Sequence, residues 1–138
     1  MTGIYHHSID AKGRVIIPSR LRDELGKDFH VTISLDNCLA AYSDESWQRF
    51  IEKVKGMSRV KQIRVRPFFS NAAKCELDTQ GRILIPQSLR DRVGLKKNIA
   101  IVGAGDCVEF WDSEEWLEVD AKETTSENLM KVFEELDF

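Results

Sequence analysis

The chain of 138 residues is 42% hydrophobic and 31% charged, as is typical of a soluble globular protein with one substantial core. It contains neither a positively charged start followed by an apolar stretch nor an apolar run of about 20 residues, so we expect a cytoplasmic protein without a membrane span. The net charge of −3 conceals a division: residues 1–97 carry 18 Lys and Arg against 11 Asp and Glu, whereas residues 98–138 carry 2 against 12. A basic body favours a polyanionic partner, although a solvated charged surface gives the same composition.

The chain contains an internal repeat. Residues 9–18 return as residues 77–86, a shift of 68 positions that brings Asp10 onto Asp78. After one extra residue in the second copy, the match continues at a shift of 69 positions to Trp47 and Trp116. Each unit has only about 45 residues, too few to bury a stable core alone, so we expect the two copies to share one core. The predicted organisation is a first repeat at 4–47, a helical connector at 48–71, a second repeat at 72–118 and an acidic helical segment at 119–138.

Each repeat opens with two short β-branched runs, residues 4–9 and 15–17 in the first copy, separated by a turn sequence. Asp10 suits the first position of a type I turn, and Gly13 in the left-handed conformation closes a three-residue hairpin with a bulge. Asp78 and Gly81 repeat the pattern. The sequence therefore predicts two equivalent hairpins.

A proline and a helical turn follow each hairpin. The predicted helices span residues 19–25 and 87–93, each preceded by proline and followed by glycine. Two further strands then complete each unit, predicted near 31–34 and 39–42 in the first copy and 99–102 and 108–111 in the second.

Three more helices are predicted outside this pattern. Apolar residues from Trp47 to Val54 recur at helical spacing, which predicts a helix that ends at Gly56. A second short helix is predicted from Ser58 to Arg66, stopped by Pro67. Ser126 is predicted to cap a terminal helix. Its apolar face suits either the core or a neighbouring subunit, and it comprises Leu129, Met130, Phe133 and Leu136.

The turns carry the chemistry of interest. Arg14 and Arg82 directly follow the turn glycines, and Lys12 adds a second cation to the first turn. A guanidinium pairs in a bidentate manner with phosphate oxygens or a guanine edge, so basic groups on a rigid tip favour DNA contact. The alternative is an Asp–Arg pair that only braces each turn. Further cations follow in the segments Arg20-Leu21-Arg22 and Arg90-Asp91-Arg92 and at Lys96-Lys97. They either widen a basic face or are ordinary solvated surface.

Other kinds of site are poorly supported. The three cysteines form no CxxC pair, and we expect Cys38 and Cys107 to be small buried hydrophobic residues. His6, His7 and Cys75 lack the spacing of a zinc site. No nucleophile with a base and no convincing carboxylate pair is present. We therefore expect no catalysis, no cofactor, no metal and no small-molecule substrate.

Two Asp-x-x-Gly-Arg turns, each followed by an apolar strand, proline and a short helix, resemble the MraZ family, whose units are of the SpoVT-AbrB swapped-hairpin type. The resemblance covers nearly the whole chain, including Tyr5-His6, the segment 35–39, Phe68-Phe69-Ser70 and the segment 76–78. It implies an α+β fold in which duplicated ββαββα swapped-hairpin units share one β-rich core, with flanking helices. One departure is visible: Asn71 stands where a glycine is expected.

The resemblance implies a bacterial, sequence-specific DNA-binding transcriptional regulator acting on the promoter of the division and cell-wall gene cluster, and hence a nucleoid-associated protein. It also implies a homo-oligomeric ring that engages short direct repeats in double-stranded DNA. A partner-binding module that assembles without DNA is the alternative. The residues expected to contact DNA are Asp10, Lys12, Arg14, Asp78, Gln80 and Arg82, with Gly13 and Gly81 forming the turns.

Overall fold

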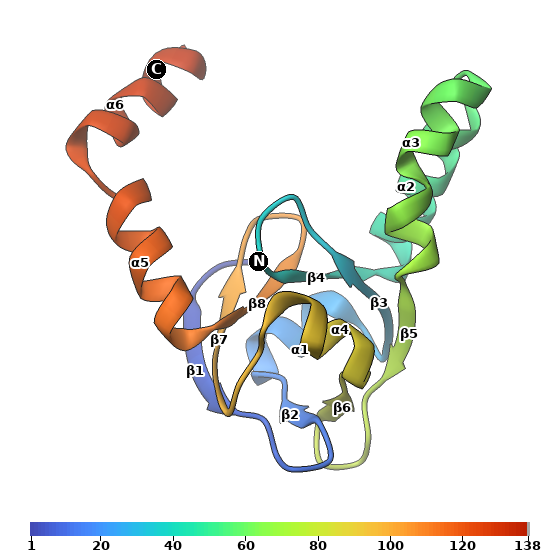
Figure 1. The fold of residues 1–138 in the computed structure, drawn as a ribbon, viewed down its shortest axis with the longest axis vertical. Helices are drawn as coiled ribbons and strands as arrows, with labels where there is room; N and C mark the ends of the chain where they lie inside the picture. Colours follow the sequence, from blue (N-terminus) through green and yellow to red (C-terminus); the bar gives the residue numbers. More distant parts are fainter. Residues whose placement is uncertain (138) are drawn as a thin grey trace.

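The computed structural model describes residues 1–137 as a mixed α+β fold (Figure 1). The same order of elements, two strands, a short helix, two strands and a longer helix, occurs twice. The first series is β1 (Ile4–Ser8), β2 (Arg14–Ile16), α1 (Ser19–Leu25), β3 (Asp28–Ile33), β4 (Leu39–Ser43) and α2 (Asp44–Lys55). The second is β5 (Ala73–Glu76), β6 (Arg82–Leu84), α4 (Gln87–Val93), β7 (Asn98–Gly103), β8 (Val108–Asp112) and α5 (Ser113–Glu123). Helix α3 (Arg59–Ser70) lies between the series, and α6 (Ser126–Glu135) follows the second.

Each sheet contains strands of both repeats. A six-stranded sheet has the order β1-β7-β8-β4-β3-β5, and β2 and β6 form a separate two-stranded sheet. All the pairings in these sheets are antiparallel. The opening strand of each repeat pairs with a strand of the other repeat: Tyr5 of β1 lies opposite Ile101, and Cys75 of β5 lies opposite Phe29. Neither repeat could therefore complete its own sheet.

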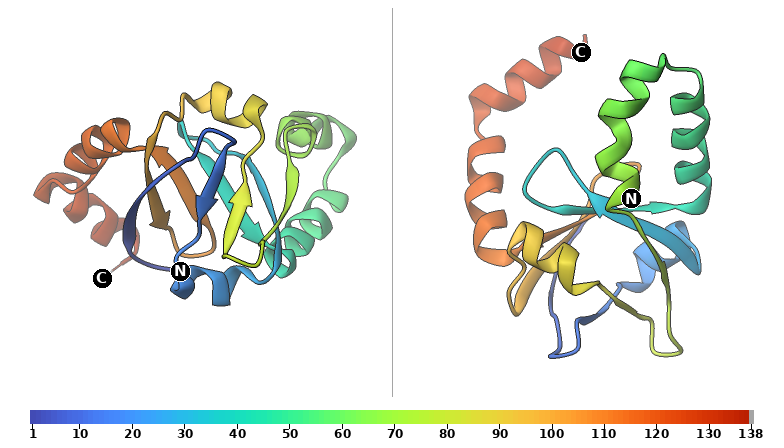
Figure 2. Two further views of the ribbon diagram at one scale, coloured as in Figure 1. Left: turned by 90° about the horizontal axis from the view of Figure 1, so that it is seen from below. Right: turned by 45° about the vertical axis from the view of Figure 1, so that its right-hand side comes forward.

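The main core draws on both repeats. Phe29 and Phe110 from the large sheet and Ile17 and Ile85, which follow β2 and β6, are fully buried. Helices α1 and α4 lie on opposite sides of the body and cover this core with Leu21, Leu25, Leu89 and Val93 (Figure 2). Both helices have the bounds that the sequence predicted. Because the two halves bury their apolar faces against each other, the repeats stabilise one body rather than two.

The equivalent cysteines differ in their surroundings. Cys38 is fully buried, as expected, whereas Cys107 is only half-buried, so the expectation of burial is wrong for the second copy. Partial burial still raises the pKa of the Cys107 thiol to about 11. Cys107 lies close to the Tyr42 hydroxyl, whose pKa burial raises to about 12.

Helix α3 does not stop at Pro67 as predicted but continues to Ser70 with the proline inside it. A proline there cannot donate to the carbonyl of Ile63, which ordinarily disfavours a helix. The next turn is held by packing instead: the Phe69 ring lies 5.6 Å from Trp47 and 5.3 Å from Phe50 between ring centroids. Tertiary aromatic contacts thus outweigh the local preference.

Asn71, the departure from the expected glycine, ends α3 without a left-handed backbone. Its φ is −98°, and its side-chain amide donates to the Pro67 carbonyl at 2.8 Å. The asparagine therefore caps the helix through its side chain, and no glycine is required at this position.

The C-terminal helices extend away from the sheets. Thr125, rather than the predicted Ser126, caps α6, since its hydroxyl accepts from the Asn128 N–H at 3.3 Å. Helices α5 and α6 project on one side of the molecule and α2 and α3 on the other, both away from the end that carries β2 and β6 (Figures 1 and 2). Within residues 1–137, no helix combines the length and apolar character needed to cross a bilayer.

Candidate nucleic-acid interface

The first turn is organised by the carboxylate of Asp10. Its Oδ1 accepts from the backbone N–H groups of Lys12 at 3.0 Å and Arg14 at 2.9 Å, and its Oδ2 accepts from Arg14 Nε at 2.7 Å. Gly13 has φ +90°, and its N–H donates to the Asp10 carbonyl at 3.0 Å. Aspartate is suited to this position because a short carboxylate can bond to backbone groups two and four residues ahead.

The second turn reproduces the same set of bonds. Asp78 Oδ1 accepts from the N–H groups of Gln80 at 2.8 Å and Arg82 at 2.9 Å, and Oδ2 accepts from Arg82 Nε at 2.9 Å. Gly81 has φ +76° and donates to the Asp78 carbonyl at 3.1 Å. Both turns thus form as the sequence predicted.

The strands that flank each turn do not pair with each other, so the predicted simple hairpins are wrong beyond the turn itself. The Asp10 N–H bonds to the Arg14 carbonyl at 3.0 Å, but β1 then pairs with β7 and β2 with β6. The turn sequence is local, whereas the choice of strand partner depends on burying the apolar faces of both repeats.

Pairing of β2 with β6 brings the two turns together. Arg14 lies opposite Leu84 and Ile16 opposite Arg82 in this ladder. The turn glycines continue it, because Ile17 N–H donates to the Gly81 carbonyl and Ile85 N–H to the Gly13 carbonyl, both at 2.9 Å. Both turns therefore project from the same end of the molecule (Figures 1 and 2).

Two arginines from the short helices reach the turns of the opposite repeat. A Cβ at Gly13 would lie 2.7 Å from the Cζ of Arg90, and a Cβ at Gly81 would overlap the Arg22 guanidinium. Arg90 is held by bonds from Nε to the Ile85 carbonyl and from Nη2 to Gln87 Oε1, both at 2.9 Å. The sequence placed Arg22 and Arg90 at equivalent positions but gave no sign that each crosses to the other repeat.

The hydrogen bonds to the two aspartates also favour the ionised form of each carboxylate. The Arg14 N–H, its guanidinium and the Lys12 N–H lower the pKa of Asp10, and the equivalent groups of Arg82 and Gln80 lower the pKa of Asp78. Both carboxylates therefore remain ionised at neutral pH and keep the arginine side chains oriented.

The ion pairs Asp10–Arg14 and Asp78–Arg82, expected if the arginines only brace the turns, are both present. They are partly open to solvent, with the Arg14 side chain 35% and the Arg82 side chain 25% exposed, so they contribute little to stability. Within each guanidinium, only Nε donates to the aspartate, and the terminal nitrogens form no hydrogen bond with other groups in residues 1–137. Bracing and ligand contact are therefore compatible: the aspartate fixes one edge of the guanidinium and leaves the other for an anion.

The remaining predicted residues lie on the same tips. Lys12 and Gln80 are exposed, so their side chains can reach a ligand beside the arginines. His6 and His7 lie on β1 opposite Ala100 and Ile99, in a different sheet from the turns. Among residues 1–137, no group of three or more His, Cys, Asp and Glu side chains is arranged to hold a metal ion.

Comparison with known proteins identifies the family of this chain. A family model described as "MraZ protein, putative antitoxin-like" matches residues 1–64 and 68–137. A protein from Lachnoclostridium phytofermentans is 50% identical, covering 83% of this chain and 82% of its own length, and one from Acetivibrio thermocellus is 51% identical with the same coverage. A protein from Caldicellulosiruptor saccharolyticus is 43% identical over 99% of this chain and 98% of its own. All three carry the name transcriptional regulator MraZ. The matched segments contain both turns and nearly every element of the fold, and the chain therefore belongs to the MraZ family.

Proposed function

We propose that this protein is a sequence-specific, DNA-binding transcriptional regulator and not an enzyme. The observation that carries the proposal is the pair of aspartate-braced turns, which present Arg14 and Arg82 from one end of the molecule. The names of the relatives support regulation of transcription. The expected contacts are guanidinium groups with phosphates or guanine edges, assisted by Lys12 and Gln80.

We further propose that the repeats are swapped-hairpin units of the SpoVT-AbrB type and that several copies act together. The exchange of opening strands between repeats supports the first point. Each turn offers only one or two strong base contacts, and each contact contributes about 1–3 kcal/mol of discrimination between bases. Such a turn alone supplies too little free energy to separate a specific site from non-specific DNA. Several copies in a ring would present the same tips in the same orientation, so the favoured DNA would contain short boxes spaced as direct repeats. The target proposed is the promoter of the division and cell-wall gene cluster, read by a cytoplasmic, nucleoid-associated protein.

The proposal is tested by fluorescence anisotropy with DNA from the promoter upstream of the protein's own gene, carrying one box or several. Arg14→Ala and Arg82→Ala should each weaken binding to multi-box DNA by about 5- to 150-fold, the equivalent of 1–3 kcal/mol, and the double variant should abolish it. Affinity should also fall steeply with salt. Arg49→Ala is the matched control, because Arg49 forms a similar i,i+4 ion pair, with Glu45 at 2.9 Å, on α2.

The outcomes separate the alternatives. If Arg14→Ala lowers the melting temperature as much as Gly13→Val while DNA affinity is unchanged, the arginine is only a brace. Equal affinity for DNA with one box and with several would refute the cooperation between copies. Affinity that does not change with salt would refute the electrostatic contacts.

A further inference from the structure

The two helical projections carry opposite charge. The basic arm, α2 and α3 (residues 44–70), holds seven Lys and Arg against three Asp and Glu, whereas the acidic arm, α5 and α6 (residues 113–135), holds two against eight. Helix α3 itself carries four cations and no acidic residue. The two arms leave the body on different sides (Figure 1). Within one molecule they are thus positioned for other partners rather than for each other.

The acidic arm ends in an exposed apolar face. On α6, the side chains of Leu129 and Val132 are each 47% exposed and Met130 is 62% exposed, and Leu136, the C-cap of this helix, is 61% exposed. Leu129, Val132 and Leu136 recur at i, i+3 and i+7 and so lie on one side of the helix. A contiguous apolar face of this kind on a charged helix marks an interaction surface.

Helix α3 of the basic arm offers a matching surface. Val60 is 63% and Ile63 is 44% exposed, and they lie i, i+3 apart on the helix. A hollow of about 250 Å³ adjoins Ile63 and is also lined by Arg59 and Arg66, among others. The four cations of α3 form no ion pair with residues 1–137, and on α6 the same is true of Glu134 and Glu135. Each helix therefore has an apolar strip beside charges of one sign that lack a counterpart.

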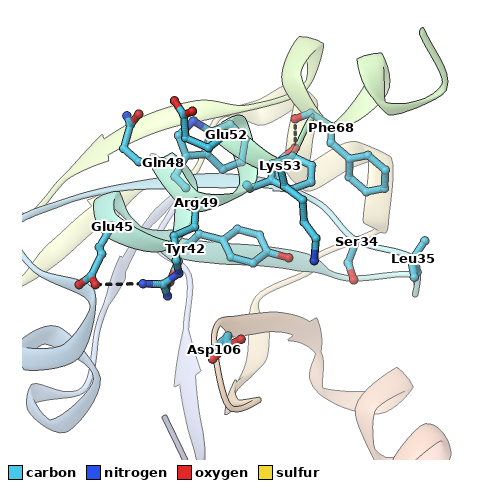
Figure 3. Close-up of a pocket in the computed structure, with 14 residues that line it drawn as sticks. Ser34, Leu35, Tyr42, Glu45, Gln48, Arg49, Glu52, Lys53, Phe68 and Asp106 are labelled. Atoms are coloured by element: carbon cyan, nitrogen blue, oxygen red, sulfur yellow. Dashed lines mark hydrogen bonds and ion pairs between the residues drawn. The ribbon is translucent and has the colours of Figure 1, made fainter. Parts of the chain in front are cut away.

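The larger groove beside α2 fits an acidic helix less well. It encloses about 1160 Å³ between α2 and the loop that carries Ser34 and Leu35 (Figure 3). Its lining includes the acidic Glu45, Glu52 and Asp106 besides two cations, and Glu45 already neutralises Arg49. Like charges at such a rim would oppose the acidic arm.

We infer that α6 of one copy docks its apolar face on Val60 and Ile63 of α3 in a second copy, with Glu134 and Glu135 beside Arg59 and Arg66. The two surfaces differ, so the contact is heterologous: each copy uses its acidic arm toward one neighbour and its basic arm toward the other. The inference rests on the proposed assembly of several copies and is independent of DNA contact. DNA is a poorer occupant of α3, because the exposed valine and isoleucine offer nothing to a phosphate.

The apolar half is tested by sedimentation velocity and light scattering of the full chain. Val132→Glu and Val60→Glu should each weaken self-association at least tenfold. Ala121→Glu, which adds the same charge at an exposed position of the acidic arm, should leave self-association unchanged. Circular dichroism should show that all three variants are folded, since every substituted side chain is exposed.

The charged half is tested by mixing two variants. Arg59→Glu with Arg66→Glu puts carboxylates at the two cation positions of the proposed contact and brings the net charge of α3 from +4 to 0, while Glu134→Lys with Glu135→Lys puts cations at the two acidic positions of α6. Each variant alone should self-associate at least tenfold more weakly, because like charges then face each other at the contact. In an equimolar mixture, the changed α3 of one variant meets the changed α6 of the other with opposite charges, and the two unchanged helices also match. Assembly should return, with the two variants alternating.

Each result has a definite meaning. Recovery of assembly in the mixture supports the contact between α3 and α6. An α3 variant that assembles like the unchanged protein overturns it, as expected if two α6 helices paired with each other. An α3 variant that assembles normally but loses DNA affinity would assign α3 to DNA. If the unchanged protein is a monomer at all concentrations, the proposed assembly fails too, whereas assembly that survives every substitution refutes only the docking.

Discussion

Replacement of Gly81 by alanine tests how the two repeats brace each other. Gly81 has φ +76°, a conformation that costs an L-residue about 1–2 kcal/mol. Its added Cβ would also overlap the Arg22 guanidinium, which reaches the turn from the first repeat. Gly94 supplies the control, since it has φ +66° and a Cβ there would meet nothing within 4 Å.

The two substitutions separate backbone strain from steric conflict. Gly94→Ala should lower the free energy of unfolding by about 1–2 kcal/mol through strain alone. Gly81→Ala should cost about 0.5–1.5 kcal/mol more than this, because the Arg22 side chain must leave its preferred rotamer to make room. The total, about 1.5–3.5 kcal/mol, corresponds to a melting temperature lower by roughly 5–14 °C for a chain of this size.

Urea denaturation at a single protein concentration provides the assay, because assembly would otherwise change the apparent stability. A double-mutant cycle with Arg22→Ala isolates the steric part: in that background, Gly81→Ala should cost no more than Gly94→Ala. Equal costs for the two glycines in the unchanged background would refute contact between Arg22 and the opposite turn. A difference that persists without Arg22 would refute it equally.

Three further predictions concern titration, reactivity and helix geometry. Hydrogen bonds from Arg82 lower the pKa of Asp78 in the folded state, so Asp78→Asn should reduce the melting temperature at pH 6. The difference in melting temperature between the variant and the unchanged protein should shrink as the pH falls below about 3.9 and vanish below the lowered pKa of Asp78. A difference that persists at pH 2 would contradict this. With its pKa raised to about 11, the Cys107 thiol should react with iodoacetamide at pH 8 roughly 100-fold more slowly than a free thiol. It should still react faster than the fully buried Cys38, as peptide mass mapping would show. Faster labelling of Cys38 would contradict its burial. Pro67→Ala should restore a helical N–H donor and raise the free energy of unfolding by about 1–3 kcal/mol in urea, whereas a fall would show that the proline positions the rings that follow it.

The sequence predicted the local elements well and the long-range pairings poorly. Turn residues and helix ends depend on neighbours in the chain, so the bounds of α1 and α4 and the turns at Asp10 and Asp78 were predictable. The strand order was not, because β1 and β2 look like a hairpin from sequence, and only the shared core decides that they enter different sheets.

The candidate site shows the same limit. The spacing of Asp10 and Arg14 identified each turn, since both lie within five consecutive residues. The approach of Arg22 and Arg90 to the opposite turns depends on the pairing of β2 with β6, which no local pattern encodes. Helix α3 ran past its predicted end for a related reason, because aromatic packing from α2 offsets the missing donor of Pro67.

The exchange of opening strands also governs how the chain can fold as it is synthesised. Strand β1 emerges first, yet its partner β7 begins at Asn98, so at about 5–20 residues per second β1 waits roughly 5–20 seconds without a neighbour. An unpaired strand edge promotes aggregation unless its sequence is polar. The residues His6, His7 and Ser8 make most of β1 polar. The protein can thus leave its first strand unpaired on the ribosome until the second repeat is nearly complete, and a chain that ends before β7 would lack the closing partner for its own N-terminus.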